Sequence, residues 1–173
     1  MKHNSIIIAA IVALLIVPVT LSAQVVNGGS SDSQQITKQP NTTYKLNAFA
    51  GVGLGLGVPV RINADYKVAD FIENYSLGVG GQLDFTFTSY GHFFVGPMAA
   101  LHCTAVNKLD LYAKLSIGAY WLTVSQVLSQ SVSVRAAGSA GVSYFFTEKL
   151  GAGVFVGYSP IGSYAGAGLA MRF

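Results

Sequence analysis

The side chains that could do chemistry are few in this chain, and they are spaced in a pattern. Its 173 residues include 10 Lys and Arg, 7 Asp and Glu, and 3 His. Six polar side chains fall on one face of alternating segments, and we expect them to form a network: Arg61, Asp65, Gln82, Asp84, Lys114 and Arg135. Charges enclosed in a narrow space must pair or be hydrated. The network is therefore either a salt-bridged plug that stabilises the fold or the lining of a narrow, weakly anion-selective pore.

A third hypothesis, from a different class of function, is an enzyme. Asp84, Ser89, His92 and Ser125 are the set that could serve as nucleophile, base and orienting group. No motif fixes their spacing, so we expect no catalysis and no catalytic residues. We also expect no cofactor and no metal ion. His92 and His102 are separated by roughly 33 Å of extended chain at ~3.3 Å per residue, which is too far to share an ion.

Two binding functions are excluded by sequence and charge. The glycine run from Gly51 to Gly57 has the spacing of neither common nucleotide-binding loop, and no helix is predicted after it. The formal net charge of +3 is too small and too scattered for nucleic-acid binding. Since glycine recurs at alternate positions, we interpret the run as one face of a strand, where missing side chains could leave gaps or a small cavity.

Strands must position these side chains, because apolar residues alternate with polar ones from Tyr44 onward. In Lys108 to Trp121, one face is Leu, Ala, Ile and Trp, and the other carries Lys, Asp, Tyr, Ser and Gly. A period of two is typical of strands whose two faces meet different surroundings. The pattern predicts eight strands, at residues 44–56, 58–68, 75–88, 91–103, 108–121, 132–146, 150–158 and 164–173. We expect Arg61 to lie near Gln82 and diagonal to Asp84.

Composition indicates which face is outside. The chain is 51% hydrophobic and 10% charged, whereas typical globular chains are about 25% charged. The predicted strands have 9 to 15 residues, so they exceed the roughly 5–6 of globular strands and reach the roughly 9–11 needed to cross a membrane. An open sheet edge in lipid would leave backbone groups unpaired, so the sheet must close. We predict an all-β, eight-stranded, antiparallel, up-and-down transmembrane β-barrel; a soluble barrel with its faces reversed is the alternative.

The N-terminal part is predicted to direct export. Lys2 precedes an apolar run from Ile6 to Val17, which is shorter than the ~20 residues of a membrane-spanning helix. The run is followed by a segment ending in Ser22 and Ala23, small residues that signal peptidase accepts. We expect residues 1–23 to be a cleaved signal peptide, 24–43 a disordered exported tail, and 44–173 the barrel.

Three stretches carry a family likeness: Asp110 to Tyr120, Val142 to Gly151, and the ending Gly168 to Phe173. Over residues 44–173 the chain resembles the small eight-stranded outer-membrane β-barrel proteins of Gram-negative bacteria, such as OmpX and the membrane domain of OmpA. The resemblance implies an outer-membrane location, periplasmic termini, contact with outer-membrane lipids and lipopolysaccharide, and recognition by the barrel assembly machinery through the strand ending at Phe173. It leaves the activity open. We expect a monomer with a structural or surface-interaction role.

Overall fold

The computed structural model describes residues 44–55, 57–72, 74–87, 90–104, 108–124, 132–160 and 162–173. The predicted signal peptide and exported tail lie outside these residues. Within the described ranges, no helix has the length and hydrophobicity needed to cross a membrane.

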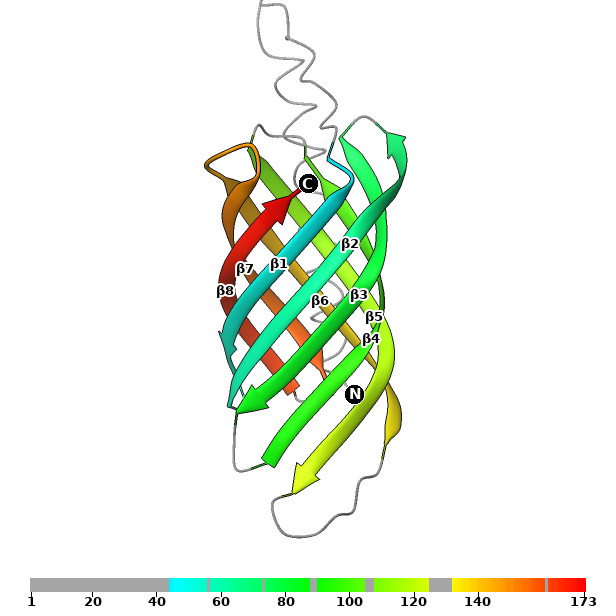
Figure 1. Ribbon diagram of the computed structural model, residues 1–173, viewed down its shortest axis with the longest axis vertical. Helices are drawn as coiled ribbons and strands as arrows, with labels where there is room; N and C mark the ends of the chain where they lie inside the picture. The colour runs from blue at the N-terminus through cyan, green and yellow to red at the C-terminus, as the bar shows by residue number, and fades with distance from the viewer. Residues whose placement is uncertain are drawn as a thin grey trace, which may run out of the picture. The chain divides into compact units, whose positions relative to one another are not determined.

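Eight strands form one closed barrel, in which each strand is antiparallel to the next and β8 pairs with β1 (Figure 1). Their bounds are β1 (Leu46–Leu54), β2 (Val58–Ile72), β3 (Tyr75–Phe87), β4 (Tyr90–Cys103), β5 (Leu109–Val124), β6 (Ser133–Phe145), β7 (Leu150–Ser159) and β8 (Gly162–Arg172). The predicted eight-stranded fold is confirmed. We call the end with Leu46 and Arg172 the proximal end, and the end with the β7–β8 turn the distal end.

The two faces of the barrel wall are chemically opposite. On β5, Leu115 and Ile117 are 70% and 58% exposed on the outer surface, whereas Asp110 and Lys114 are 3% and 4% exposed in the lumen. A continuous apolar exterior of this kind is favourable against hydrocarbon and unfavourable in water. The prediction that apolar side chains point outward is confirmed, and the alternative with reversed faces is wrong.

Aromatic side chains mark both ends of the apolar surface. Near the distal end, Phe85, Phe93 and Trp121 are neighbours across β3, β4 and β5, and the ring centroids of Phe93 and Trp121 lie 4.6 Å apart. Near the proximal end, Tyr66 and Tyr144 are exposed on the outer surface. Aromatic belts of this kind lie at the two boundaries between lipid and water.

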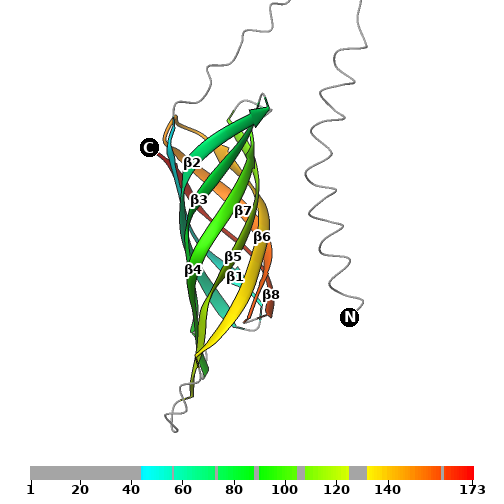
Figure 2. The same ribbon diagram turned by 90° about the vertical axis from the view of Figure 1, so that its right-hand side faces the viewer.

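The barrel wall is uneven at the distal end. β5 has 16 residues and β7 only 10. The ladder between β6 and β7 begins at Gly138, so within the described part of the chain Ser133–Ala137 pair with β5 alone. Figures 1 and 2 show the long β5 extending beyond the turn between β7 and β8. At the distal end, the part of the wall formed by β4–β6 therefore extends beyond the shorter part formed by β7 and β8. The edge of β6 that faces β7 is open there.

Candidate functional site

Arg61 of β2 and Asp84 of β3 form a bidentate ion pair inside the barrel. Arg61 Nε and Nη2 donate to the two carboxylate oxygens of Asp84 at 2.8 and 2.7 Å, and Gln82 Nε2 donates to Asp84 Oδ2 at 2.7 Å. All three side chains are buried. The planar fork of an arginine matches a carboxylate in two parallel bonds, which fixes the orientation of both groups. We call these three residues the Arg61 cluster.

The register of β2 against β3 differs from the sequence prediction by two residues. Arg61 lies directly opposite Asp84, and it is Asn63 that lies opposite Gln82. The cause is the position of the turn: the predicted strands centre it between residues 71 and 72, whereas Ile72 pairs with Tyr75, which alone would shift the pairing by four residues. Two irregularities in the ladder within residues 67–72 take back two of these four. The predicted neighbourhood of Arg61 is therefore correct, but the direct partner is the acid rather than the amide.

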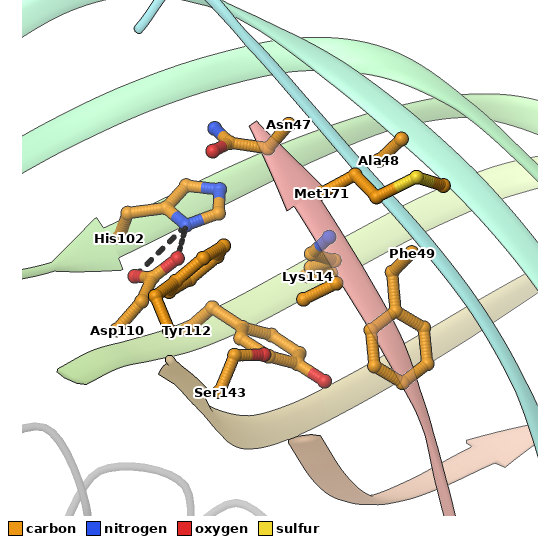
Figure 3. Close-up of a pocket in the computed structure, with 11 residues that line it drawn as sticks. Asn47, Ala48, Phe49, His102, Asp110, Tyr112, Lys114, Ser143 and Met171 are labelled. Carbon is orange, nitrogen blue, oxygen red and sulfur yellow. Dashed lines mark hydrogen bonds and ion pairs between the residues drawn. The ribbon is translucent and has the colours of Figure 1, made fainter. Parts of the chain in front are cut away.

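A second cluster lies nearer the proximal end and is centred on His102 of β4. Its Nε2 atom is 3.0 Å from Asp65 Oδ1 of β2, and its Nδ1 atom is 3.0 Å from Asp110 Oδ2 of β5. Figure 3 shows the Asp110 carboxylate facing the His102 ring. Because ionised carboxylates only accept hydrogen bonds, both ring nitrogens donate, and the ring bridges the two acids as an imidazolium.

Two further cations complete this second cluster. Lys114 Nζ donates to Asn63 Oδ1 at 2.7 Å and to Asp65 Oδ2 at 3.2 Å, and Arg172 Nη2 is 3.2 Å from Asp110 Oδ2. Because Lys114 belongs to β5 and Asp65 to β2, their contact spans the lumen between strands that are not neighbours. We call the whole set the His102 cluster, which consists of Asn47, Asn63, Asp65, His102, Asp110, Lys114 and Arg172.

Aromatic rings cover the other side of the buried cations. Each of three cations lies over a ring: Arg61 over Tyr164 at 4.7 Å, Lys114 over Tyr112 at 4.8 Å, and Arg172 over Phe145 at 3.7 Å from the centroid. The face of an aromatic ring attracts a cation, and more strongly where water is excluded. The acids come from β2, β3 and β5, and the rings from β5, β6 and β8. The lumen thus has an ionic side and an aromatic side.

Inward glycines make room for these rings. A methyl group at Gly51 would lie 2.7 Å from the Phe49 ring and 3.0 Å from the Phe155 ring, and one at Gly157 would lie 2.7 Å from Tyr164 Oη. At Gly51, one of the glycines predicted to leave a gap or a small cavity, rings therefore occupy the space instead. A hollow of about 10 Å³ remains beside the His102 cluster (Figure 3), which is room for about one water molecule.

Arg135 is the residue of the predicted network that joins neither cluster. It lies on the inward face of β6, as predicted, but its side chain is exposed and its Nε donates to Ser133 Oγ at 3.3 Å. It belongs to the part of β6 that projects beyond β7, where the opposite wall is missing. The prediction that Arg135 belongs to the enclosed network is therefore corrected.

Asp84 and His92, the two residues of the hypothetical catalytic set that the structure describes, both bind other partners. The carboxylate of Asp84 is taken up by Arg61 and Gln82. The Nδ1 atom of His92 is bonded instead to Tyr120 Oη, at 2.6 Å. The two serines of the set, Ser89 and Ser125, lie outside the described residues.

His102, Asp110 and Arg172 are buried in the lumen but are not among the six residues of the predicted network. The alternation of apolar and polar residues along their strands is sufficient to predict that these three side chains face the lumen. It could not identify partners, because a cross-lumen contact such as Lys114 to Asp65 depends on the stagger of strands around the barrel. The ring partners were missed for the same reason.

These features define a class of protein: a closed, eight-stranded β-barrel with an apolar exterior and a charged interior, as in transmembrane β-barrels. Known structures share this fold. The N-terminal β-barrel domain of Pseudomonas aeruginosa OprF is 18% identical, with a TM-score of 0.56 over 75% of this chain and 98% of that one. A de novo designed transmembrane β-barrel is also 18% identical, with a TM-score of 0.52 over 75% and 95%. The outer membrane enzyme PagL is 14% identical, with a TM-score of 0.47 over 73% and 98%.

The likeness to these structures concerns the fold, which is that of small outer-membrane β-barrels, as the sequence resemblance implied. No protein-family model matches the chain, and no curated protein matches it in sequence. A designed barrel and a natural one share the fold equally well, so function has to be argued from the lumen and the rims.

Proposed function

We propose that the protein is a non-conducting, non-catalytic β-barrel of the Gram-negative outer membrane with a structural or surface-interaction role. The observation that carries the proposal is the lumen, where two ion-pair clusters and the rings beside them occupy the interior. In this proposal residues 1–23 direct export, the strand ending at Phe173 is read by the barrel assembly machinery, and the outer surface meets outer-membrane lipids and lipopolysaccharide as a monomer. The distal end then faces the cell exterior.

The interaction role is supported by the open edge of β6. Ser133–Ala137 bond to β5 on one side, and no ladder partner occupies the other side within the described residues. Unpaired backbone donors and acceptors on a strand edge are a ready template for an added strand. At the distal end this edge would stand outside the membrane, where an extended peptide segment of another protein could pair with it.

A narrow pore for small solutes and a lipid A-modifying enzyme are the alternatives. A continuous pore needs an open path, whereas Lys114 is paired with Asp65 across the lumen and the Arg61–Asp84 pair, nearer the distal end, lies against the Tyr164 ring of β8. Lumens of eight-stranded barrels are commonly filled by side chains. An enzyme needs a base oriented toward a nucleophile, and His92 is oriented by Tyr120 instead.

Planar-bilayer recording of the refolded chain tests the proposal. We expect no discrete current steps at high salt, because the ion pairs and rings block the axis. Insertion is verified in parallel by quenching of the single tryptophan, Trp121, with brominated lipids. Discrete, salt-dependent steps from protein that passes this control would contradict the proposal and favour the pore. Hydrolysis or acyl transfer on added lipid A would favour the enzyme.

Amide hydrogen exchange tests the open edge separately. We expect every second amide of Ser133–Ala137 to exchange rapidly, because it points away from β5. The amides of Gly138–Phe145 should all be protected, because this segment pairs with both β5 and β7. Uniform protection along β6 would show that the edge is already covered and would remove the basis for the interaction role.

A further inference from the structure

We propose that the inner face of the projecting β4–β6 wall is a binding site for a tetrahedral oxyanion, such as a phosphate group, formed by His92, Tyr120, Ser133 and Arg135. The inference is independent of whether the lumen conducts. It begins from a contrast among the inward cations. Arg61, Lys114 and Arg172 are each buried against a carboxylate, whereas Arg135 is on the same face of the wall with no acidic partner among the described residues.

The backbone register brings the four side chains together. Tyr120 of β5 pairs directly with Ser133 of β6, and Arg135 is the diagonal neighbour on the same face. Directly paired side chains in antiparallel strands lie about 4.5–5.5 Å apart at Cβ, and diagonal ones about 7–8 Å. His92 of β4 reaches Tyr120 from the other side, with Nδ1 2.6 Å from Tyr120 Oη. Three adjacent strands therefore contribute to one concave surface.

Three of the four side chains, His92, Ser133 and Arg135, have hydrogen-bond donors available for a ligand. When Tyr120 Oη donates to His92 Nδ1, the proton of the neutral ring is on Nε2, which then donates outward. Arg135 uses Nε for Ser133 Oγ, which leaves both terminal nitrogens of its guanidinium fork to donate. Of the nearby acids on this face, Asp84 is held by Arg61. The donors that remain are His92 Nε2, the Ser133 hydroxyl and the two terminal nitrogens of Arg135, whereas Tyr120 orients the His92 ring. Together with one uncompensated positive charge they are complementary to an oxyanion, and arginine binds phosphate in a bidentate manner.

Access to the surface is given by the uneven wall. His92, Tyr120 and Ser133 are half-buried and Arg135 is exposed, because β7 and β8 do not extend as far toward the distal end as these residues. The site therefore opens to the distal side and toward the shorter wall. A phosphate group could arrive on a soluble molecule or on a lipid headgroup at that rim.

Nuclear magnetic resonance of the full chain tests this proposal, in micelles of an uncharged maltoside detergent, because phosphocholine detergents carry a competing phosphate. Inorganic phosphate is titrated at constant ionic strength against chloride. We expect saturable shifts confined to His92, Tyr120, Ser133 and Arg135. Arg135→Gln should weaken binding about tenfold or more, since a charge-assisted bidentate contact is lost. Arg135→Lys, which keeps the charge without the fork, should be intermediate.

Lys149→Gln is the matched control, because it removes the same charge from an exposed position at the proximal end. It should leave phosphate binding unchanged. A second titration, with micelles doped with a phosphate-monoester lipid, identifies the source: shifts in both titrations indicate that a soluble phosphate suffices, and shifts with lipid alone assign the headgroup. Absence of saturable shifts in both titrations overturns the site, as does an equal loss of affinity in Lys149→Gln and Arg135→Gln.

Discussion

Arg61 illustrates, at the scale of single residues, how a charge is accommodated inside this barrel. Removing a guanidinium from water costs several kcal/mol. Two hydrogen bonds to Asp84 and the ring of Tyr164 offset that cost. Lys114 and Arg172 are held in the same way, by an acid on one side and a ring on the other. The polar interior is stable because each of these buried acids is paired with at least one cation and each of these cations contacts an acid.

Removing either partner of the Arg61–Asp84 pair leaves a buried charge without its counter-charge. We expect Arg61→Ala and Asp84→Ala each to lower the free energy of unfolding by about 3–5 kcal/mol. The double variant should cost less than the sum, with a coupling of about 0.5–3 kcal/mol. Urea unfolding in lipid vesicles, followed by Trp121 fluorescence, measures all three variants. Small and strictly additive losses would show that the pair does not stabilise the barrel.

Tyr164 allows a buried ring and a buried hydroxyl to be tested separately, because the two should have different effects on the free energy of unfolding. The ring contacts Arg61, whereas Oη is buried and makes no hydrogen bond among the described residues. We expect Tyr164→Phe to leave the free energy of unfolding unchanged or to raise it by up to about 2 kcal/mol, because an unsatisfied buried hydroxyl is removed. Tyr164→Leu should lower it by roughly 1–3 kcal/mol through lost packing and the lost ring contact. The same urea titration applies, and a larger loss for Tyr164→Phe than for Tyr164→Leu contradicts this assignment.

At the scale of strands, alternation was enough to predict which residues face inward. The pattern in β5 predicted that Leu115 and Ile117 point outward and that Asp110 and Lys114 point to the lumen, and the structure confirms all four. It could not predict register, because register depends on where the turn lies and on the two ladder irregularities within residues 67–72, and neither changes the hydrophobic pattern of residues 58–68. The predicted ranges 132–146 and 150–158 already make β6 longer than β7, but alternation alone places Arg135 on the inward face without showing that no wall stands opposite it.

Glycine positions within the strands give a further prediction at this scale. Gly51 faces the lumen, where an added methyl group would meet the Phe49 and Phe155 rings and the backbone oxygen of Ala167. Gly81 faces outward, and the nearest atom to an added methyl group is 3.8 Å away. We expect Gly51→Ala to lower the free energy of unfolding by about 1–3 kcal/mol through overpacking. Gly81→Ala should be neutral, or stabilising by about 0.5–1 kcal/mol, because alanine loses less backbone entropy on folding.

The measurement is the urea midpoint of each variant in the same lipid. Equal effects of Gly51→Ala and Gly81→Ala would indicate that the two faces have similar free space. The lumen would then be less filled than its ring contacts indicate.

At the scale of the whole molecule, the barrel has a lipid-facing band and a projecting distal edge, and charges should be tolerated differently on each. Leu115 is 70% exposed on the outer face of β5, and Val134 is 74% exposed on the projecting part of β6. We expect Leu115→Arg to lower the free energy of unfolding in a bilayer by about 2–4 kcal/mol and Val134→Arg by about 0–1 kcal/mol. Refolding into vesicles and urea titration compare the two, and equal costs would place Val134 within the hydrocarbon.

The central claim is that the apolar face of every strand meets hydrocarbon and that the charged face encloses a sealed axis. Lipids with a spin label near the end of the acyl chain test it most directly, because they broaden the magnetic resonance signals of groups that touch the membrane interior. In nanodiscs containing such lipids, the signals of Leu115, Ile117 and Leu169 should be strongly broadened, and those of His102, Ser116 and Ser139 should persist. Broadening of the second set with survival of the first would contradict the account.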